Sequence, residues 1–429
     1  MNKINNPNRE DWKTVLQRPT QTVADIEGLV NGIFREVAED GDIKLKKYTQ
    51  QFDKVNLGDL LVSAAEIEEA KNSVSEELKN AIQLAKSNIE TFHKAQKTGR
   101  IEVETAPGVT CWQEKRPIQK VGLYIPGGTA PLFSTILMLA VPAAIAGCTE
   151  IILCSPPDKE GKLNPAILYT ANICGVTKIV KVGGIQAIAG MTFGTESIPQ
   201  VYKIFGPGNQ YVTVAKQIAT KHGVAIDMPA GPSELLVVAD DTANAAFVAS
   251  DLLSQAEHGV DSQVILVSTS KKMIDNVEKE VEMQLEGLPR KEIARKAISN
   301  SKLIYVEDDQ TAIDLINEYG PEHYIVCVAN EDFFIKHTQN AGSVFIGNYT
   351  PESAGDYASG TNHTLPTNGY AKQYSGVNLD SFMKSMTFQK ISSEGIQNIG
   401  NAVELMAEAE GLQAHKNAVT LRLNSLKNK

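Results

Sequence analysis

The sequence predicts an α/β protein that is built on two parallel, doubly wound sheets. Short apolar segments, typical of buried strands, alternate with helix-period segments, and this alternation favours strand–helix–strand units. A first series of expected strands comprises residues 120–125, 150–154, 178–182 and 201–205, with helices near 131–146, 164–174, 185–193 and 209–222. A second series of expected strands comprises residues 235–239, 263–267, 303–306, 324–328 and 343–346.

These two series define the expected domains. Residues 123–232 are expected to form one α/β domain, and residues 233–376 the core of another. The helix-period segments within 23–122 are expected to complete the domain that contains 233–376. Residues 1–22 are polar and are expected to form an N-terminal arm, whereas 377–429 are mostly helical in pattern and are expected to form a C-terminal extension.

Length and charge exclude several classes of protein. The chain has 429 residues, enough for two or three domains, and its net charge of −10 argues against nucleic acid or an anionic membrane as a main partner. The apolar run at 130–147 is interrupted by Pro142 and contains Ser134 and Thr135, so it predicts a buried helix rather than a membrane span. The first residues lack the apolar core of a signal peptide, and a cytoplasmic location is expected.

The cysteine pattern argues against a thiolate zinc site. The five cysteines are odd in number and scattered, and no CxxC pair occurs; they are Cys111, Cys148, Cys154, Cys174 and Cys327. Buried, reduced thiols are the expected state.

One polar pair ends the helix that joins two strands of the second series. Gln255 and His258 are three residues apart and therefore lie on one face of that helix. Such a pair could bind a metal ion, but on spacing alone an ordinary solvated helix end is the more common explanation. Spacing alone does not decide between these readings.

A second pair lies where a helix gives way to a strand. Gly320-Pro321 ends the helix, and Glu322-His323 follow directly. A carboxylate beside an imidazole could transfer protons near neutral pH. The alternative is two polar residues in a surface loop.

Two more segments contribute candidates. Residues 347–376 are rich in glycine and polar side chains and have no clear period; a loop of this length within a domain is often functional, and it carries Asp356 and His363. Glu410 and His415 lie near the end of the chain with Gly411 between them. Turn chemistry would explain the first pair, and a solvated helix end the second.

Nucleotide binding is indicated by turns rather than by the usual fingerprint. No GxGxxG occurs, but glycine turns follow three expected strands of the first series at 125–129, 183–186 and 206–209. Each turn leads into a helix, and helix N-termini at the carboxyl edge of an open α/β sheet favour phosphate. Ordinary turn chemistry would explain any one of them.

Six segments together resemble one family. They are Gly122-Leu-Tyr124-Ile-Pro-Gly-Gly, Phe205-Gly-Pro-Gly-Asn209, Asp227-Met-Pro-Ala-Gly-Pro-Ser233-Glu, Ser254-Gln-Ala-Glu-His258-Gly, Gly320-Pro-Glu-His323 and Gly355-Asp-Tyr-Ala-Ser-Gly-Thr-Asn-His363. In this order they are similar to the histidinol dehydrogenase family, over about residues 20–425. The resemblance implies two Rossmann-like domains of the aldehyde-dehydrogenase-like type with parallel-rich sheets, an N-terminal arm and a helical C-terminal extension.

The resemblance also implies a reaction. L-histidinol would be oxidised through L-histidinal to L-histidine, the last step of histidine biosynthesis, with two NAD⁺ reduced in succession. It implies one zinc ion per subunit and a homodimer whose C-terminal segment completes the partner's site. Because the implied ligands offer nitrogen and oxygen only, manganese and cobalt would also fit.

The resemblance further implies roles for individual residues. The zinc ligands would be Gln255, His258, Asp356 and His415, and the acid/base pair would be Glu322 and His323. Histidinol would contact the zinc ligands and His323, together with Ser233, His363 and Glu410. NAD would contact Tyr124, Gln186 and Asn209.

Three other functions compete with this reading. A cysteine-nucleophile aldehyde dehydrogenase would use Cys111 or Cys148, although the apolar neighbours of Cys148 disfavour it. A metal-dependent hydrolase or lyase would use the same metal ligands without redox chemistry. A binding protein could hold zinc for structure alone, in a closed coordination shell.

Overall fold

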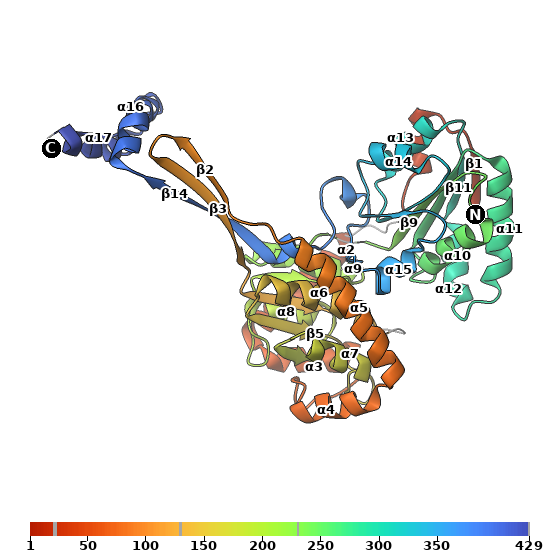
Figure 1. Ribbon diagram of the computed structural model, residues 1–429. Helices are drawn as coiled ribbons and strands as arrows, with labels where there is room; N and C mark the ends of the chain where they lie inside the picture. Colours follow the sequence, from red (N-terminus) through yellow and green to blue (C-terminus); the bar gives the residue numbers. More distant parts are fainter. Residues whose placement is uncertain (20–23, 128–130, 230, 428–429) are drawn as a thin grey trace. The chain divides into compact units, whose positions relative to one another are not determined.

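A computed structural model describes residues 1–19, 24–127, 131–229 and 231–427. The chain forms two compact units (Figure 1). The first unit comprises residues 1–96 and 118–382, and the second comprises residues 97–117 and 383–429.

The first unit contains a six-stranded parallel sheet. Its strand order is β1 (Asn2–Asn5), β11 (Lys302–Tyr305), β10 (Gln263–Ser268), β9 (Glu234–Ala239), β12 (His323–Cys327) and β13 (Ser343–Ile346). Alternate residues of β9 enter two different cores, as the two-residue period of a strand requires. Leu235 packs with α10 (Ala245–Ala256), α11 (Lys271–Leu285) and α12 (Lys291–Ser299), whereas Leu236 packs with α1 (Trp12–Val15), α13 (Asp309–Tyr319) and α14 (Glu331–His337).

A second parallel sheet, of five strands, lies in the same unit. Its order is β6 (Lys178–Val180), β5 (Glu150–Cys154), β4 (Lys120–Tyr124), β7 (Lys203–Phe205) and β8 (Ala225–Ile226). One face is covered by α4 (Ala64–Ser73), α5 (Glu76–Ala95), α6 (Phe133–Ala146) and α7 (Pro165–Ile173). The other face is covered by α2 (Ala24–Asp40), α3 (Asp42–Phe52), α8 (Gly184–Phe193) and α9 (Gln210–Lys221). The expected fold class, two parallel α/β sheets of Rossmann-like type, is confirmed.

The early helices pack differently from the expected grouping. The sequence pattern predicts that residues 23–122, which contain helices α2 to α5, complete the domain of residues 233–376, but these helices pack against the five-stranded sheet. Val30 and Phe34 of α2 share a core with Ile152 and Val180, and Ile89 of α5 shares one with Leu123. That grouping is wrong, because an apolar helix face does not specify which sheet it covers.

The N-terminal arm also differs from expectation. Residues 1–22 contain β1, which pairs with β11 at the edge of the six-stranded sheet, and Trp12, which is buried in its core. The arm is therefore an integral part of this sheet.

The second unit is a three-stranded antiparallel sheet with two helices. Its strand order is β14 (Met383–Ile391), β3 (Val109–Pro117) and β2 (Ile101–Ala106), followed in the chain by α16 (Ser393–Ala409) and α17 (Gln413–Lys427). Trp112 stacks on Phe388, with 5.3 Å between ring centroids. The extension at 377–429 is thus not wholly helical, and the unit recruits residues 97–117, which were expected to belong to an α/β domain.

The long polar segment 347–376 is partly ordered by short helices. It contains α15 (Glu352–Tyr357) and a 3₁₀ turn at Tyr370–Lys372, and another 3₁₀ turn at Leu379–Phe382 precedes β14. Helix α15 places Glu352 and Asp356 one turn apart on the same face, which a reading of the segment as a loop does not reveal.

A buried ion pair fixes the turn after β7. Lys216 of α9 and Asp227 are 3% and 1% exposed, respectively, and form an ion pair. Lys216 Nζ also donates to the carbonyl oxygen of Gly206 (2.8 Å), and an Asp227 oxygen accepts from the Gly206 N–H (2.8 Å). Gly206 has a φ of 131°, and an added Cβ would collide with the Tyr124 carbonyl. The pair therefore holds a glycine turn that no larger residue could form.

The substitution Lys216→Met is expected to leave the Asp227 charge buried and unpaired. The free energy of unfolding should fall by about 3–5 kcal/mol, as for other broken buried pairs. Urea denaturation followed by circular dichroism measures this loss. The control is Lys221→Met on the same helix, whose exposed pair with Glu27 should contribute about 1 kcal/mol or less. Equal losses for the two variants would contradict the account.

Candidate functional site

Three carboxylates surround one buried imidazole at the amino ends of β9 and β12. His323 Nδ1 lies 3.6 Å from Glu322 Oε2 and 4.0 Å from Glu352 Oε1, and Nε2 lies 3.5 Å from Asp356 Oδ1. Nδ1 is also 3.2 Å from the Glu234 carbonyl oxygen. We call His323, Glu322, Glu352 and Asp356 the acidic cluster.

The acidic cluster favours the protonated form of His323. Burial by itself would lower the pKa of His323, but the negative charges of Glu352 and Glu322 and the contact with Asp356 outweigh it and raise the pKa well above its usual value. Burial and the neighbouring carboxylates raise the pKa of Glu352 to about 8, although His323 acts in the opposite direction. For Asp356, burial opposes the change, but His323 still lowers the pKa. Three carboxyl groups are thus crowded around one cationic imidazole, and a proton on Glu352 relieves part of their repulsion near neutral pH.

The same cluster offers donors for a metal ion. Oxygen or nitrogen atoms of His258, Glu352 and Asp356 all lie within 4.8 Å of one another. In the described part of the chain, His323 Nε2, Glu352 Oε2 and Asp356 Oδ1 are buried and have no hydrogen-bond partner. Buried polar atoms without partners are rare in folded proteins. These atoms and the mixed nitrogen and oxygen donor set fit a divalent cation such as zinc.

The amide of Gln255 borders this donor set. If its nitrogen faces Glu352, it donates to that carboxylate, and its oxygen accepts from the Glu234 N–H (3.1 Å). If its oxygen faces Glu352, two oxygens meet, and only a proton or a metal ion between them would make the contact favourable. Gln255 is 1% exposed, so water cannot relieve this contact. The expected ligands Gln255, His258 and Asp356 are therefore brought together, with Glu352 as a fourth donor that the sequence did not reveal.

The N-terminal arm supports the cluster from behind. The Arg18 guanidinium donates from Nε and Nη2 to the two carboxylate oxygens of Glu234 (2.5 and 2.8 Å) and lies over the Tyr319 ring, 3.9 Å from its centroid. The Glu234 N–H donates to Glu322 Oε2 (2.8 Å). Burial raises the pKa of Glu234, and the Arg18 charge opposes that rise. Arg18 therefore allows Glu234 to remain charged beside the cluster.

The other expected substrate residues divide between the two units. His363 is close to the cluster: Nδ1 is 2.9 Å from the Asp356 carbonyl oxygen, and Nε2 is 3.0 Å from Thr135 Oγ1 at the start of α6. Ser233 directly precedes β9 and is half-buried. Glu410 and His415 belong to the second unit, where both are exposed on α16–α17.

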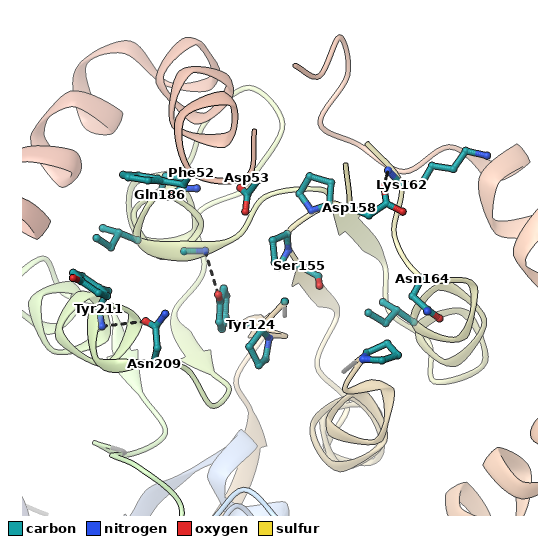
Figure 2. Close-up of a pocket in the computed structure, with 18 of the residues that line it drawn as sticks. Phe52, Asp53, Tyr124, Ser155, Asp158, Lys162, Asn164, Gln186, Asn209 and Tyr211 are labelled. Atoms are coloured by element: carbon teal, nitrogen blue, oxygen red, sulfur yellow. Dashed lines mark hydrogen bonds between the residues drawn. The ribbon is translucent and has the colours of Figure 1, made fainter. Parts of the chain in front are cut away.

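A large cavity lies at the carboxyl edge of the five-stranded sheet. Its volume is about 850 Å³, and all three expected cofactor residues, Tyr124, Gln186 and Asn209, line it (Figure 2). Tyr124 ends β4, and its hydroxyl accepts from the Gly184 N–H at the start of α8 (3.2 Å). Burial raises the pKa of Tyr124 to about 12, so the phenol stays protonated.

Two helices begin at this cavity. Gly184 adopts a φ of 62° in the first turn of α8, which favours glycine, and Asn209 caps α9 by accepting from the Tyr211 and Val212 N–H groups. Helix N-termini attract phosphate. All three glycine turns contribute to the cavity: the turn at 125–129 through Pro126 and Gly127, the turn at 183–186 through Gly184 and Gln186, and the turn at 206–209 through Asn209. Residues 128 and 129 of the first turn lie outside the described residues.

Of the two cysteine candidates, Cys148 does not resemble a nucleophile. Cys148 follows α6, and burial raises the pKa of its thiol to about 12, so a thiolate is scarce at neutral pH. Cys111 lies on β3 of the second unit and forms no disulfide.

No helix in the described ranges is both long and apolar enough to cross a membrane.

Comparisons with known proteins agree on one family. Residues 16–423 match the family model described as histidinol dehydrogenase. Histidinol dehydrogenase of Bacteroides thetaiotaomicron is 59% identical over 427 residues, covering 100% of both chains, and that of Escherichia coli is 52% identical over 421 residues, covering 97% of this chain and 96% of its own.

Solved structures give the same result. Histidinol dehydrogenase from Elizabethkingia anophelis superposes with a TM-score of 0.98 at 56% identity, covering 100% of this chain and 99% of its own. An acetylating aldehyde dehydrogenase from Geobacillus thermoglucosidasius superposes with a TM-score of 0.51 at 14% identity, covering 88% of this chain and 93% of its own. At this level of identity the similarity shows a shared fold only. The chain belongs to the histidinol dehydrogenase family.

Proposed function

We propose that this chain oxidises L-histidinol to L-histidine in two successive steps, with zinc bound at the edge of the acidic cluster and NAD⁺ bound in the cavity of the five-stranded sheet. The observation that carries the proposal is the convergence of Gln255, His258 and Asp356 around His323, in a member of this family. On this account the reaction is the last step of histidine biosynthesis in the cytoplasm.

In this proposal His323 transfers the protons. Its Nδ1 faces the Glu234 carbonyl, which leaves Nε2, without a hydrogen-bond partner in the described part of the chain, as the nitrogen that accepts the proton of the substrate alcohol. Glu322 is the neighbouring carboxylate that would activate water to attack the aldehyde before the second oxidation. Its oxygen is held by the Glu234 N–H, so the position of the base is fixed.

The metal would be held by Gln255, His258 and Asp356, with His415 as the fourth ligand. When bound, zinc would supply a Lewis acid for the substrate and would offset the carboxylate charges that keep His323 protonated. Ser233, His363 and Glu410 would bind and orient histidinol. His363 suits this role because burial lowers the pKa of its imidazole, which favours the neutral form.

The cofactor would lie against Tyr124, Gln186 and Asn209, and would supply the hydride acceptor for both oxidations. Residues 123–232 are the proposed NAD-binding domain, and the six-stranded sheet carries the catalytic residues. Thr135 links the two functions, because it lies four residues after Pro131 of the cavity lining and contacts His363.

A homodimer with shared sites accounts for Glu410 and His415. Both side chains are exposed, and the same helices expose apolar residues: Leu405, Met406 and Leu421 are 58%, 66% and 62% exposed. Exposed apolar side chains concentrated on one small unit are typical of an interface. We therefore propose that the second unit completes the site of a partner subunit.

The first test measures NADH formation from L-histidinol and NAD⁺. Two NADH are expected for each histidinol consumed, because each oxidation removes one hydride. Chelation should abolish the rate, and added zinc should restore it. If no NADH forms with a zinc-loaded protein, the chain is no dehydrogenase of histidinol; if turnover persists in protein shown to be free of metal, the metal assignment is wrong.

The second test mixes two inactive variants. In His323→Ala homodimers and in His415→Asn homodimers every site should be defective, whereas a mixed dimer would regain one intact site. Random exchange should restore about one quarter of the activity of the unchanged enzyme, since half of the dimers are mixed and each has one working site. Each variant carried through the exchange alone is the control. If mass spectrometry verifies exchange and no activity returns, the sites are not shared.

A further inference from the structure

Arg18 joins three segments that are distant in the sequence and that all contribute to the acidic cluster. Its guanidinium donates to the Glu234 carboxylate at the start of β9, and Nη2 also donates to the Tyr319 carbonyl oxygen at the end of α13 (2.9 Å). The Asn368 N–H donates to the same carboxylate (2.7 Å), from the polar segment that carries Asp356. Three parts of the chain therefore meet at one ion pair, to which the function proposed above gives no role.

Residue 234 contacts both members of the acid/base pair through its backbone. Its N–H donates to Glu322 Oε2 (2.8 Å), and its carbonyl oxygen lies 3.2 Å from His323 Nδ1. Because both contacts come from the main chain, they depend on where residue 234 lies rather than on the chemistry of its side chain. Whatever fixes the Glu234 side chain therefore also fixes the donor and the acceptor that face Glu322 and His323.

The ion pair of Arg18 and Glu234 has a fixed geometry. The two side chains are 16% and 3% exposed, respectively, and two nitrogens of the guanidinium bind the two oxygens of the carboxylate. The face of the guanidinium lies over the fully buried Tyr319 ring, 3.9 Å from its centroid. A planar group that binds a carboxylate at its edge and a ring on its face has one orientation, which the compact ammonium group of a lysine could not reproduce.

A separate set of contacts attaches the N-terminal arm next to Arg18. Lys302 Nζ donates to the Gln17 carbonyl oxygen (3.0 Å), and the Gln263 amide nitrogen donates to the same oxygen (3.1 Å). These contacts hold the backbone of the arm, whereas the Arg18 side chain holds Glu234. The attachment of the arm and the position of Glu234 can therefore be tested separately.

We propose that Arg18 is a positioning residue for Glu322 and His323, because its bidentate pair with Glu234 fixes the backbone N–H and carbonyl oxygen that hold the carboxylate and the imidazole in place. The inference rests on the proposed function, in which these two side chains transfer protons. A displacement of about 1 Å in a catalytic group can lower a rate by roughly 100-fold, so a residue behind the site can control turnover. Arg18 acts through Glu234 and touches none of the reacting atoms.

The experiment compares Arg18→Met and Arg18→Lys with the unchanged zinc-loaded enzyme. In Arg18→Met, kcat should fall by about tenfold to 100-fold because Glu322 and His323 lose their alignment, whereas the KM for NAD⁺ and the zinc content should stay the same. Arg18→Lys keeps the charge but not the two-point contact, so it should recover the melting temperature and only part of kcat. Full recovery of kcat in Arg18→Lys would overturn the proposal, and this variant alone decides the outcome if Arg18→Met fails to fold.

Lys302→Met is the matched control, because it weakens the attachment of the arm at Gln17 and leaves Arg18 in place. This variant should keep the kcat of the unchanged enzyme. A purely structural role of the arm predicts instead that kcat falls in both Lys302→Met and Arg18→Met in proportion to the folded fraction. That result would overturn the proposal.

A crystal structure of Arg18→Met separates this inference from the proposed function, because it requires no turnover. The distance from Glu234 N to Glu322 Oε2, which is 2.8 Å here, should exceed about 3.5 Å, beyond the range of a hydrogen bond. If this hydrogen bond is unchanged, the role of Arg18 is overturned while the proposed function stands. If the distance lengthens but the unchanged enzyme forms no NADH from histidinol, Arg18 still positions Glu322 and only the proposed function fails.

Discussion

The confinement of like charges around His323 is the constraint on which the site depends. Glu322, Glu352 and Asp356 surround one imidazole in a largely buried pocket, and an arrangement of this kind is stable only when bound protons or positive charge offset the carboxylate charges. At the rear of the pocket, Arg18 offsets the negative charge of Glu234 through a bidentate ion pair. A divalent cation held by Gln255, His258 and Asp356, beside the Glu352 carboxyl group, would offset the negative charge at the front of the pocket, and this would couple metal binding to the acid–base state of His323.

One site lies at the carboxyl edge of its sheet, and the other lies at the amino edge of its sheet. The cavity lies at the carboxyl edge of the five-stranded sheet, where open α/β sheets usually bind ligands, whereas the acidic cluster lies at the amino edge of the six-stranded sheet. Gln255 reaches that edge because α10 runs back along the sheet after β9. The fold resembles that of an aldehyde dehydrogenase, yet the thiol of Cys148 is suppressed as a nucleophile, so a shared fold does not determine the chemistry.

The sequence predicts the two parallel sheets well because buried strands such as β9 are continuous apolar segments. It misses β2 because that strand is exposed along almost its whole length, and it groups α2 with the wrong sheet because amphipathicity reveals a buried face but not its partner. In the site, the three-residue spacing of Gln255 and His258 is visible in advance. The part played by Glu352 cannot be predicted from the sequence, because Glu352 lies one turn from Asp356 only when a short helix forms in a segment without a clear period.

The central claim is that a divalent cation binds at the edge of the acidic cluster, at defined ligands. Anomalous X-ray diffraction at the zinc absorption edge, from crystals of the zinc-loaded protein, tests it directly. The account predicts one strong peak per subunit, bounded by Gln255, His258 and Asp356, with His415 of a partner subunit as the fourth ligand and a marked loss of the peak in Asp356→Asn. A peak elsewhere, or a peak at this position that is unchanged in Asp356→Asn, would contradict the account.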